Sequence, residues 1–150
     1  MASTTFSGPV TSTNGFIGAL TGNIAGTGRI THTPTAINAT ATATAAQVAT
    51  GYITVTSATA VAITLPTGTL LGAALGAVQG TVFDLYIDNT ASTSTGIVTM
   101  VVATNGILST AAADTPGSFG DLTVAVGATG IGRFTLMFSS ATAYVFTRTA

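Results

Sequence analysis

Short runs of alternating apolar and polar residues recur along the chain and predict β-strands. The clearest run covers residues 81–88, where Phe83, Leu85 and Ile87 point to one side and the intervening residues to the other. Side chains of a strand alternate between the two faces of a sheet, so a period of two indicates a strand with one buried face. Similar runs predict strands at residues 52–56, 60–65, 97–103, 122–126, 134–138 and 144–148.

Turn signals separate these runs and favour tight connections. Asn14-Gly15 and Asn105-Gly106 are typical of two-residue hairpin turns, which need positive φ at both central positions. The glycine-rich segment 127–132 lacks the Lys-Ser/Thr of a phosphate-binding loop and is interpreted as a further hairpin turn. Eight or more short strands with frequent turns predict an all-β fold, either an antiparallel β-sandwich or a jelly-roll-like barrel. No regular repeat of 20–50 residues is visible, which argues against a solenoid.

The chain divides into two predicted regions. Residues 1–48 form an extended N-terminal arm or hairpin region, and residues 49–150 form the β-sandwich body. Within the arm, residues 36–46 alternate small apolar and hydroxyl groups, most clearly in Ala39 to Ala45, which favours a strand or extended arm, with a low-complexity linker as the alternative. Residues 69–79 are the one segment that suggests a helix, but Gly at every fourth position disfavours it. A single buried helical turn or an apolar loop is therefore preferred there.

The composition excludes more classes of function than the predicted fold does. Only 5% of the residues are charged, the formal net charge is −1, and there is no cysteine. Three arginines cannot form the basic patch that nucleic-acid binding or an anionic membrane surface requires, so neither partner is expected. The absence of cysteine removes disulfides and thiolate metal sites and fits assembly in a reducing cytoplasm. No segment has the roughly 20 apolar residues of a membrane-spanning helix.

No set of residues predicts catalysis, a cofactor or a metal. His32 is the only histidine, whereas a metal site needs three or four ligands, so a packing role beside Pro34 is preferred. Asp84 and Asp88 share a strand face but lie about 13 Å apart at strand spacing, too far for a glycosidase pair. The chain is therefore not expected to be an enzyme.

Threonine pairs of the form Thr-x-Thr raise ice binding as a further possibility. A flat ice-binding face would need such pairs to stack at a fixed spacing, whereas the intervals here are irregular. High β-propensity and an uncharged polar surface explain the threonines more simply. The pairs are Thr40/Thr42, Thr42/Thr44, Thr54/Thr56, Thr67/Thr69, Thr93/Thr95 and Thr147/Thr149.

Three segments resemble small virion proteins of tailed bacteriophages. They are the opening Thr5-Phe6-Ser7-Gly8-Pro9-Val10-Thr11-Ser12-Thr13-Asn14-Gly15-Phe16, the central Gly80-Thr81-Val82-Phe83-Asp84-Leu85-Tyr86-Ile87-Asp88-Asn89-Thr90 preceded by Ile63-Thr64-Leu65-Pro66, and the ending Gly132-Arg133-Phe134-Thr135 with Ser140 to Arg148. The likeness covers most of the chain, although the Thr/Ala-rich arm departs from it and no binding residue transfers by motif. The resemblance implies a capsid decoration (cement) protein, a homotrimer at local threefold axes of the outer capsid.

These observations together give one expected function and its alternatives. The chain is expected to be a structural virion protein, made in the host cytoplasm, that binds the major capsid protein and stabilises the shell. Within the arm, Phe6, Phe16 and Ile17 are the candidate apolar contacts with the capsid. A trimer would also cover sheet edges that this sequence barely protects with charge. The alternative is a receptor-binding or adhesive knob of a phage fibre or head, and ice binding is less favoured.

Overall fold

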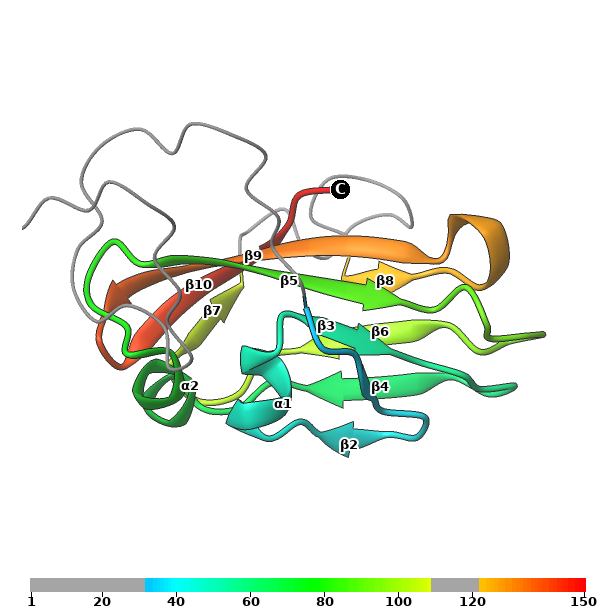
Figure 1. Ribbon diagram of the computed structural model, residues 1–150, viewed down its shortest axis with the longest axis horizontal. Coiled ribbons are helices and arrows are strands. Elements are labelled where there is room, and N and C mark those ends of the chain that lie inside the picture. Colours follow the sequence, from blue (N-terminus) through cyan, green and yellow to red (C-terminus); the bar gives the residue numbers. More distant parts are fainter. Residues whose placement is uncertain (1–31, 109–121) are drawn as a thin grey trace, which may run out of the picture. The chain divides into compact units, whose positions relative to one another are not determined.

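The computed structural model describes residues 32–108 and 122–150, which form two mixed β-sheets and two short helices (Figure 1). In the six-stranded sheet the order is β1-β3-β5-β9-β10-β7, and in the four-stranded sheet it is β2-β4-β6-β8. The strands are β1 (Thr35–Ala36), β2 (Ala41–Thr42), β3 (Tyr52–Thr54), β4 (Val61–Thr64), β5 (Val82–Asp88), β6 (Val98–Val101), β7 (Gly106–Leu108), β8 (Thr123–Val124), β9 (Ile131–Ser140) and β10 (Ala143–Arg148). The helices are α1 (Ala45–Ala49) and α2 (Gly68–Leu75), and a 3-10 turn covers Gly127–Thr129.

From β1 to β9, successive strands alternate between the two sheets. Neighbours within a sheet are therefore mostly strands two apart in the chain, and β1, β3 and β5 run parallel, as do β2, β4 and β6. Each passage through the other sheet brings the chain back in its original direction, which makes these pairs parallel. The fold is β-rich as expected, but the expectation of antiparallel pairing is wrong for most of the sequence before β9. Antiparallel pairing joins β5 to β9, β9 to β10 and β6 to β8.

The predicted strand faces are confirmed. Leu85 and Ile87 of β5, and Phe134, Leu136 and Phe138 of β9, are buried, while residues between them face outward. Both sheets contribute to one hydrophobic cluster, because the alternation places their apolar faces against each other. Its largest fully buried side chains are Tyr144, Phe134, Phe138, Phe146, Ile53, Ile63, Leu65, Leu71, Leu85, Ile87, Met100 and Leu136.

Two expected hairpins are instead passages between the sheets. Asn105 does adopt positive φ (64°) in a turn, but it leads from β6 of one sheet to β7 of the other, where β7 pairs parallel with β10. Likewise, Gly127–Thr129 leads from β8 to β9 of the opposite sheet. A turn does occur at Asn105, but Gly106 lacks the positive φ of the predicted hairpin turn and begins β7 instead. A turn signal also does not fix which strand becomes the next neighbour.

Within residues 35–48 of the predicted arm, β1 and β2 belong to the two sheets and most of α1 follows them. The alternation at residues 36–46 predicted only an extended chain, yet a helix begins at Ala45. Thr44 accepts a hydrogen bond from the Gln47 backbone N–H, and the Gln47 side chain accepts one from the Thr44 N–H. This capping box satisfies the first free donors of the helix. The spacing Thr44-x-x-Gln47 is the sequence signal for α1.

Helix α2 is longer than the single turn preferred from sequence. The Thr67 hydroxyl caps its first turn by accepting from the Leu70 N–H, and Gly76 ends it in the left-handed conformation (φ 59°). Gly68 and Gly72 bring the helix against the β9–β10 turn, since a Cβ on either residue would overlap the carbonyl oxygen of Thr142 or Ala141. Close backbone contact therefore offsets the helix-weakening effect of glycine.

Candidate interaction surface

An apolar row crosses the outer face of the six-stranded sheet. The strand registers place Val82 of β5 opposite Met137 of β9, Met137 opposite Val145 of β10, and Val145 opposite Ile107 of β7. Val82, Met137 and Ile107 are 58%, 53% and 55% exposed, and Val145 is partly buried. These four residues, called the apolar row below, are neighbours on four consecutive strands. Exposed apolar side chains that adjoin one another favour contact with another molecule.

The row follows from the same alternation that builds the core. Leu136 and Phe138 point inward, so Met137 between them must point outward. The sequence pattern therefore predicted the outward direction of Val82 and Met137. It could not align them with Val145 and Ile107, because that alignment depends on which strands pair and in which register.

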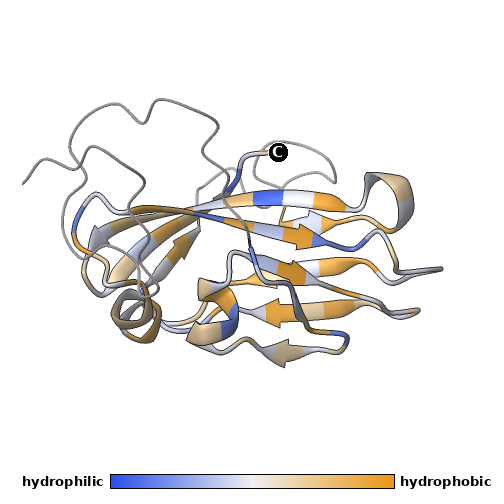
Figure 2. Ribbon diagram, viewed as in Figure 1, coloured by the Kyte–Doolittle hydropathy of each residue, from blue (hydrophilic) through white to orange (hydrophobic). Residues whose placement is uncertain are grey.

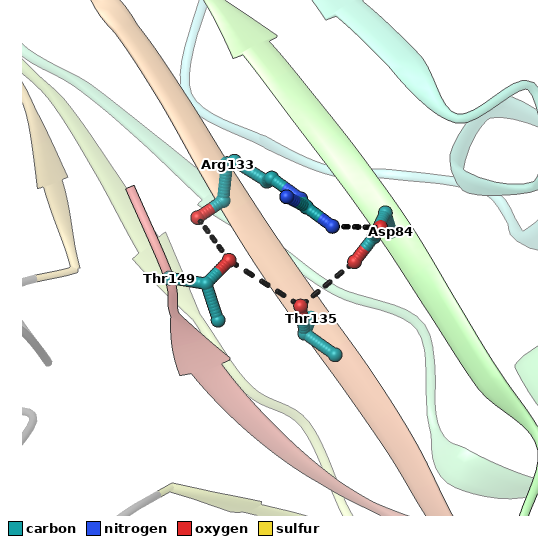
Figure 3. A network of polar contacts seen from close by, with 4 residues as sticks. All are labelled: Asp84, Arg133, Thr135 and Thr149. Carbon is teal, nitrogen blue, oxygen red and sulfur yellow. Dashed lines mark hydrogen bonds and ion pairs between the residues drawn. The ribbon is translucent and has the colours of Figure 1, made fainter.

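A polar network lies on the same face beside the row (Figure 3). Arg133 Nη2 donates to Asp84 Oδ2 at 2.6 Å, and the Thr135 hydroxyl donates to Asp84 Oδ1 at 2.7 Å. The Thr135 and Thr149 hydroxyl oxygens are 3.3 Å apart, and Thr149 Oγ1 donates to the Arg133 carbonyl. The hydrogen bond from Arg133 is the largest influence holding the pKa of Asp84 below its usual value. The carboxylate is thus ionised, and its charge is balanced within the sheet.

Aromatic side chains form a further row on this face. Tyr52 of β3 lies opposite Tyr86 of β5, which lies opposite Arg133 of β9. The guanidinium carbon of Arg133 is 6.0 Å from the Tyr86 ring centroid, at the limit of a cation–π contact. The His32 ring lies 5.9 Å from the Tyr86 ring, and its Nδ1 is 2.9 Å from the Thr50 carbonyl oxygen. His32 thus packs against Tyr86 and Thr50, whereas the sequence suggested packing beside Pro34.

Asp88 is the last residue of β5 on this face, and its carboxylate accepts hydrogen bonds of its own. Its carboxylate accepts from the Thr90 hydroxyl and backbone N–H, at 2.6 and 3.0 Å, and from the Tyr52 hydroxyl at 2.6 Å. The bonds from Thr90, and then that from Tyr52, lower the pKa of Asp88. The same hydrogen bond to Asp88 is the main cause of the raised pKa of Tyr52. These bonds favour the ionised carboxylate and hold both side chains in place.

The face combines carboxylates that already have hydrogen-bond partners with exposed apolar and partly exposed aromatic side chains. Its carboxylates are engaged in hydrogen bonds that hold them ionised and in place. Within residues 32–108 and 122–150, no three His, Cys, Asp or Glu side chains gather closely enough to hold a metal ion. Tyrosine, arginine and methionine, which this face carries, are enriched in the buried centres of protein interfaces.

The outer face of the four-stranded sheet is smaller and lacks charged side chains among the described residues. Its registers align Thr42 with Thr64 and Val101, and Ala62 with Thr99 and Thr123. The Thr-x-Thr pairs do not stack there: Thr54 and Thr147 lie in the other sheet, and Thr67 caps α2. This arrangement differs from the array that ice binding would require.

A shallow apolar groove of about 450 Å³ lies between α2 and the β9–β10 turn. Small residues line it, namely Thr69, Gly72, Ala73, Gly76, Ala77, Ala141 and Thr142. Figure 2 shows that α2 is coloured mainly as hydrophobic, and Leu70 of this helix is exposed. The groove offers an apolar shape with two threonine hydroxyls as its polar side-chain groups.

The predicted capsid contacts Phe6, Phe16 and Ile17 lie outside the described residues, as does the Asn14-Gly15 turn. The structure therefore leaves these predictions where the sequence put them. Among the residues that the structure describes, no helix is long and apolar enough to cross a membrane.

Comparisons of the chain with family models, with curated proteins and with solved structures found no match.

Proposed function

We propose that this chain is a structural virion protein that binds the outer capsid of a tailed bacteriophage and stabilises the shell. It would act as a homotrimer at local threefold axes, with the major capsid protein as its partner, after synthesis in the host cytoplasm. The proposal includes a sandwich-like body and no catalytic activity. It rests on the sequence resemblance and on one structural observation, the apolar row beside an ion pair whose charge is already balanced.

The apolar row supports this role because assembly needs surfaces that can be covered at low cost. Burying a lone charge costs several kcal/mol, whereas Asp84 already has Arg133 and Thr135 as partners. Contacts made by apolar and hydroxyl groups are also less sensitive to salt than exposed ion pairs. A surface of this kind suits contacts between subunits of an oligomer that must stay assembled on a shell under varied conditions.

Mass spectrometry of purified virions tests the proposal directly. The chain should be present in a fixed ratio to the major capsid protein, and purified protein should cosediment with tailless shells. Deleting residues 2–17, which include Phe6 and Phe16, should abolish shell binding while leaving the oligomer folded. Absence from virions together with failure to bind shells would overturn the proposal, and retained binding of the deletion variant would overturn the role of the arm.

A receptor-binding or adhesive knob is the second candidate. The two neighbouring tyrosines Tyr52 and Tyr86, with Arg133 beside Tyr86, favour it. Two tyrosines beside Asp88 combine flat apolar area with hydrogen-bonding groups, as binding sites for polar ligands do. Such a knob should bind host cells or isolated glycans without any shell present. Cell binding that is lost in a Tyr86→Ala variant, with no shell binding by the wild type, would favour this candidate.

A further inference from the structure

We propose that copies of this chain associate through the outer face of the six-stranded sheet, with the apolar row at the centre of the contact. This inference rests on the proposed function only in taking the chain to be a homo-oligomer, and it names the surface responsible. The partner is a second copy of the chain.

Polarity is the first argument for this surface. The apolar row places four uncharged side chains on four consecutive strands, and three of them are more than half exposed. Interface centres are depleted in charged residues and enriched in apolar ones. Methionine also adapts its shape to a facing surface more readily than branched residues do. Met137, which lies between Val82 and Val145, is well placed to be the central contact.

The size of the face is the second argument, because it distinguishes the six-stranded sheet from the four-stranded sheet. Six strands at about 4.8 Å spacing span about 24 Å, and seven residues of β5 span about 23 Å, giving roughly 550 Å² of flat area. A standard interface buries about 800 Å² on each partner, so this face supplies most of one. Four strands and the four residues of β6 give only roughly 190 Å² on the other sheet. The six-stranded sheet is therefore the better candidate.

Charge is the third argument, and it favours a second copy over a charged partner. Among the described residues, the carboxylate nearest to the row along β5 is that of Asp84, two residues from Val82, and Arg133 already balances it. Asp88 lies six residues from Val82 along β5, or about 20 Å, so it falls at the rim of a contact centred on the row. A second copy brings an identical neutral row and therefore buries no unpaired charge at the centre.

The edge of the sheet adds to this argument. β7 is the last strand in the sheet order among the described residues, and its exposed Ile107 ends the apolar row. A strand edge without charged side chains is prone to associate with another chain unless something covers it. A neighbouring copy on the row would cover this side of the sheet as well.

Sedimentation equilibrium of the full-length chain and of Met137→Glu and Ile131→Glu variants tests the inference. Both residues lie on the outer face of β9, and they are 53% and 54% exposed, so Ile131→Glu is a matched control outside the row. We expect the wild type and Ile131→Glu to sediment above the 14.6 kDa monomer mass, and Met137→Glu to associate about a hundredfold more weakly. Ile107→Glu, at the other end of the row, should weaken association too. It replaces Met137→Glu as the test if circular dichroism shows that Met137→Glu is unfolded.

A monomeric wild type would overturn the inference, as would folded Met137→Glu and Ile107→Glu variants that associate like the wild type. If Val101→Glu on the four-stranded sheet abolishes association instead, the contact lies on that sheet and the inference is wrong. Shell cosedimentation, measured separately, distinguishes this failure from that of the proposed function. A monomer that binds shells refutes only the self-association surface, whereas an oligomer that depends on Met137 but binds no shells refutes only the capsid role.

Discussion

The ring of Tyr144 lies against the backbone of Gly106 on the neighbouring strand, and no side chain can be added there without moving it. The two residues are register partners in the β10–β7 pair. A Cβ on Gly106 would lie 2.7 Å from the ring carbon Cζ and the hydroxyl oxygen of Tyr144. The ring cannot easily withdraw, because its hydroxyl donates to the buried Pro66 carbonyl at 3.1 Å.

Gly106→Ala should therefore destabilise the fold by about 1–3 kcal/mol, as overpacking of a fixed ring does. Urea unfolding of the purified chain measures this change. In a Tyr144→Ala background the same glycine substitution should cost much less, because the clash is gone. Equal costs in the two backgrounds would show that the Tyr144 ring is not the obstacle.

Tyr144 should also make the protein sensitive to alkali. Burial raises its pKa to about 12, above the value of about 10 for an unfolded tyrosine. Its contribution to stability is complete below about pH 10 and is lost as the pH rises through about 12, since only the unfolded chain ionises in that window. Ultraviolet titration should show a tyrosine that ionises near pH 12 or together with unfolding, in addition to Tyr52, whose pKa is raised by its hydrogen bond to Asp88. In Tyr144→Phe the transition near pH 12 should disappear, and an unchanged titration curve near that pH would show that Tyr144 is not its source.

Asn89 should be among the polar residues most important for stability. Its buried side-chain amide donates to the carbonyl oxygens of Gly96, Val124 and Ala125 at 2.8–3.1 Å. It thereby links the end of β5 to the segments around β6 and β8 in the other sheet. Asn89→Ala leaves buried acceptors without a donor and should cost roughly 2–4 kcal/mol in the free energy of unfolding.

A second asparagine provides the control for Asn89. The exposed Asn38 accepts one hydrogen bond, from the Thr56 N–H, so Asn38→Ala should cost about 1 kcal/mol or less in the same denaturation experiment. Asn89→Asp should be worse than Asn89→Ala, because a carboxylate would face three carbonyl oxygens. Similar losses for Asn38→Ala and Asn89→Ala would contradict the linking role of Asn89.

The ion pair of Asp84 and Arg133 should contribute to stability only above the acid range. Because the pKa of Asp84 is lowered in the folded state, its contribution is present above about pH 4 and is lost as the pH falls below that value. The pair is partly exposed, with the Arg133 side chain 45% and the Asp84 side chain 32% accessible, so solvent screening should keep the effect small. The difference in Tm between the wild type and Asp84→Asn should shrink from pH 6 to pH 2.5. A difference that stays constant with pH would show that the charge on Asp84 does not stabilise the fold.

Part of the candidate surface could be predicted from sequence because it depends on local alternation alone. The pattern Phe83, Leu85, Ile87 fixed the inward face of β5, and so placed Val82, Asp84, Tyr86 and Asp88 outside. That pattern could not predict that Asp84 lies beside Arg133 and Thr135. These residues are about 50 positions away in the sequence, and they meet only through the β5–β9 register.

The sequence by itself determined the positions of β3 to β6 and β8 to β10, the buried faces of β5 and β9, the turn at Asn105 and the scarcity of charge, but not β1, β2 and β7. These properties depend on residues close together in the chain, through side-chain alternation and local backbone preference. Only the tertiary structure decided that successive strands alternate between two sheets, that most early neighbours are parallel, and that the apolar row exists. The core side chains Ile63 and Ile87 would be equally buried beside several possible neighbours, so the choice is made by packing of the whole chain. The surface inferred to bind a second copy is a product of that choice.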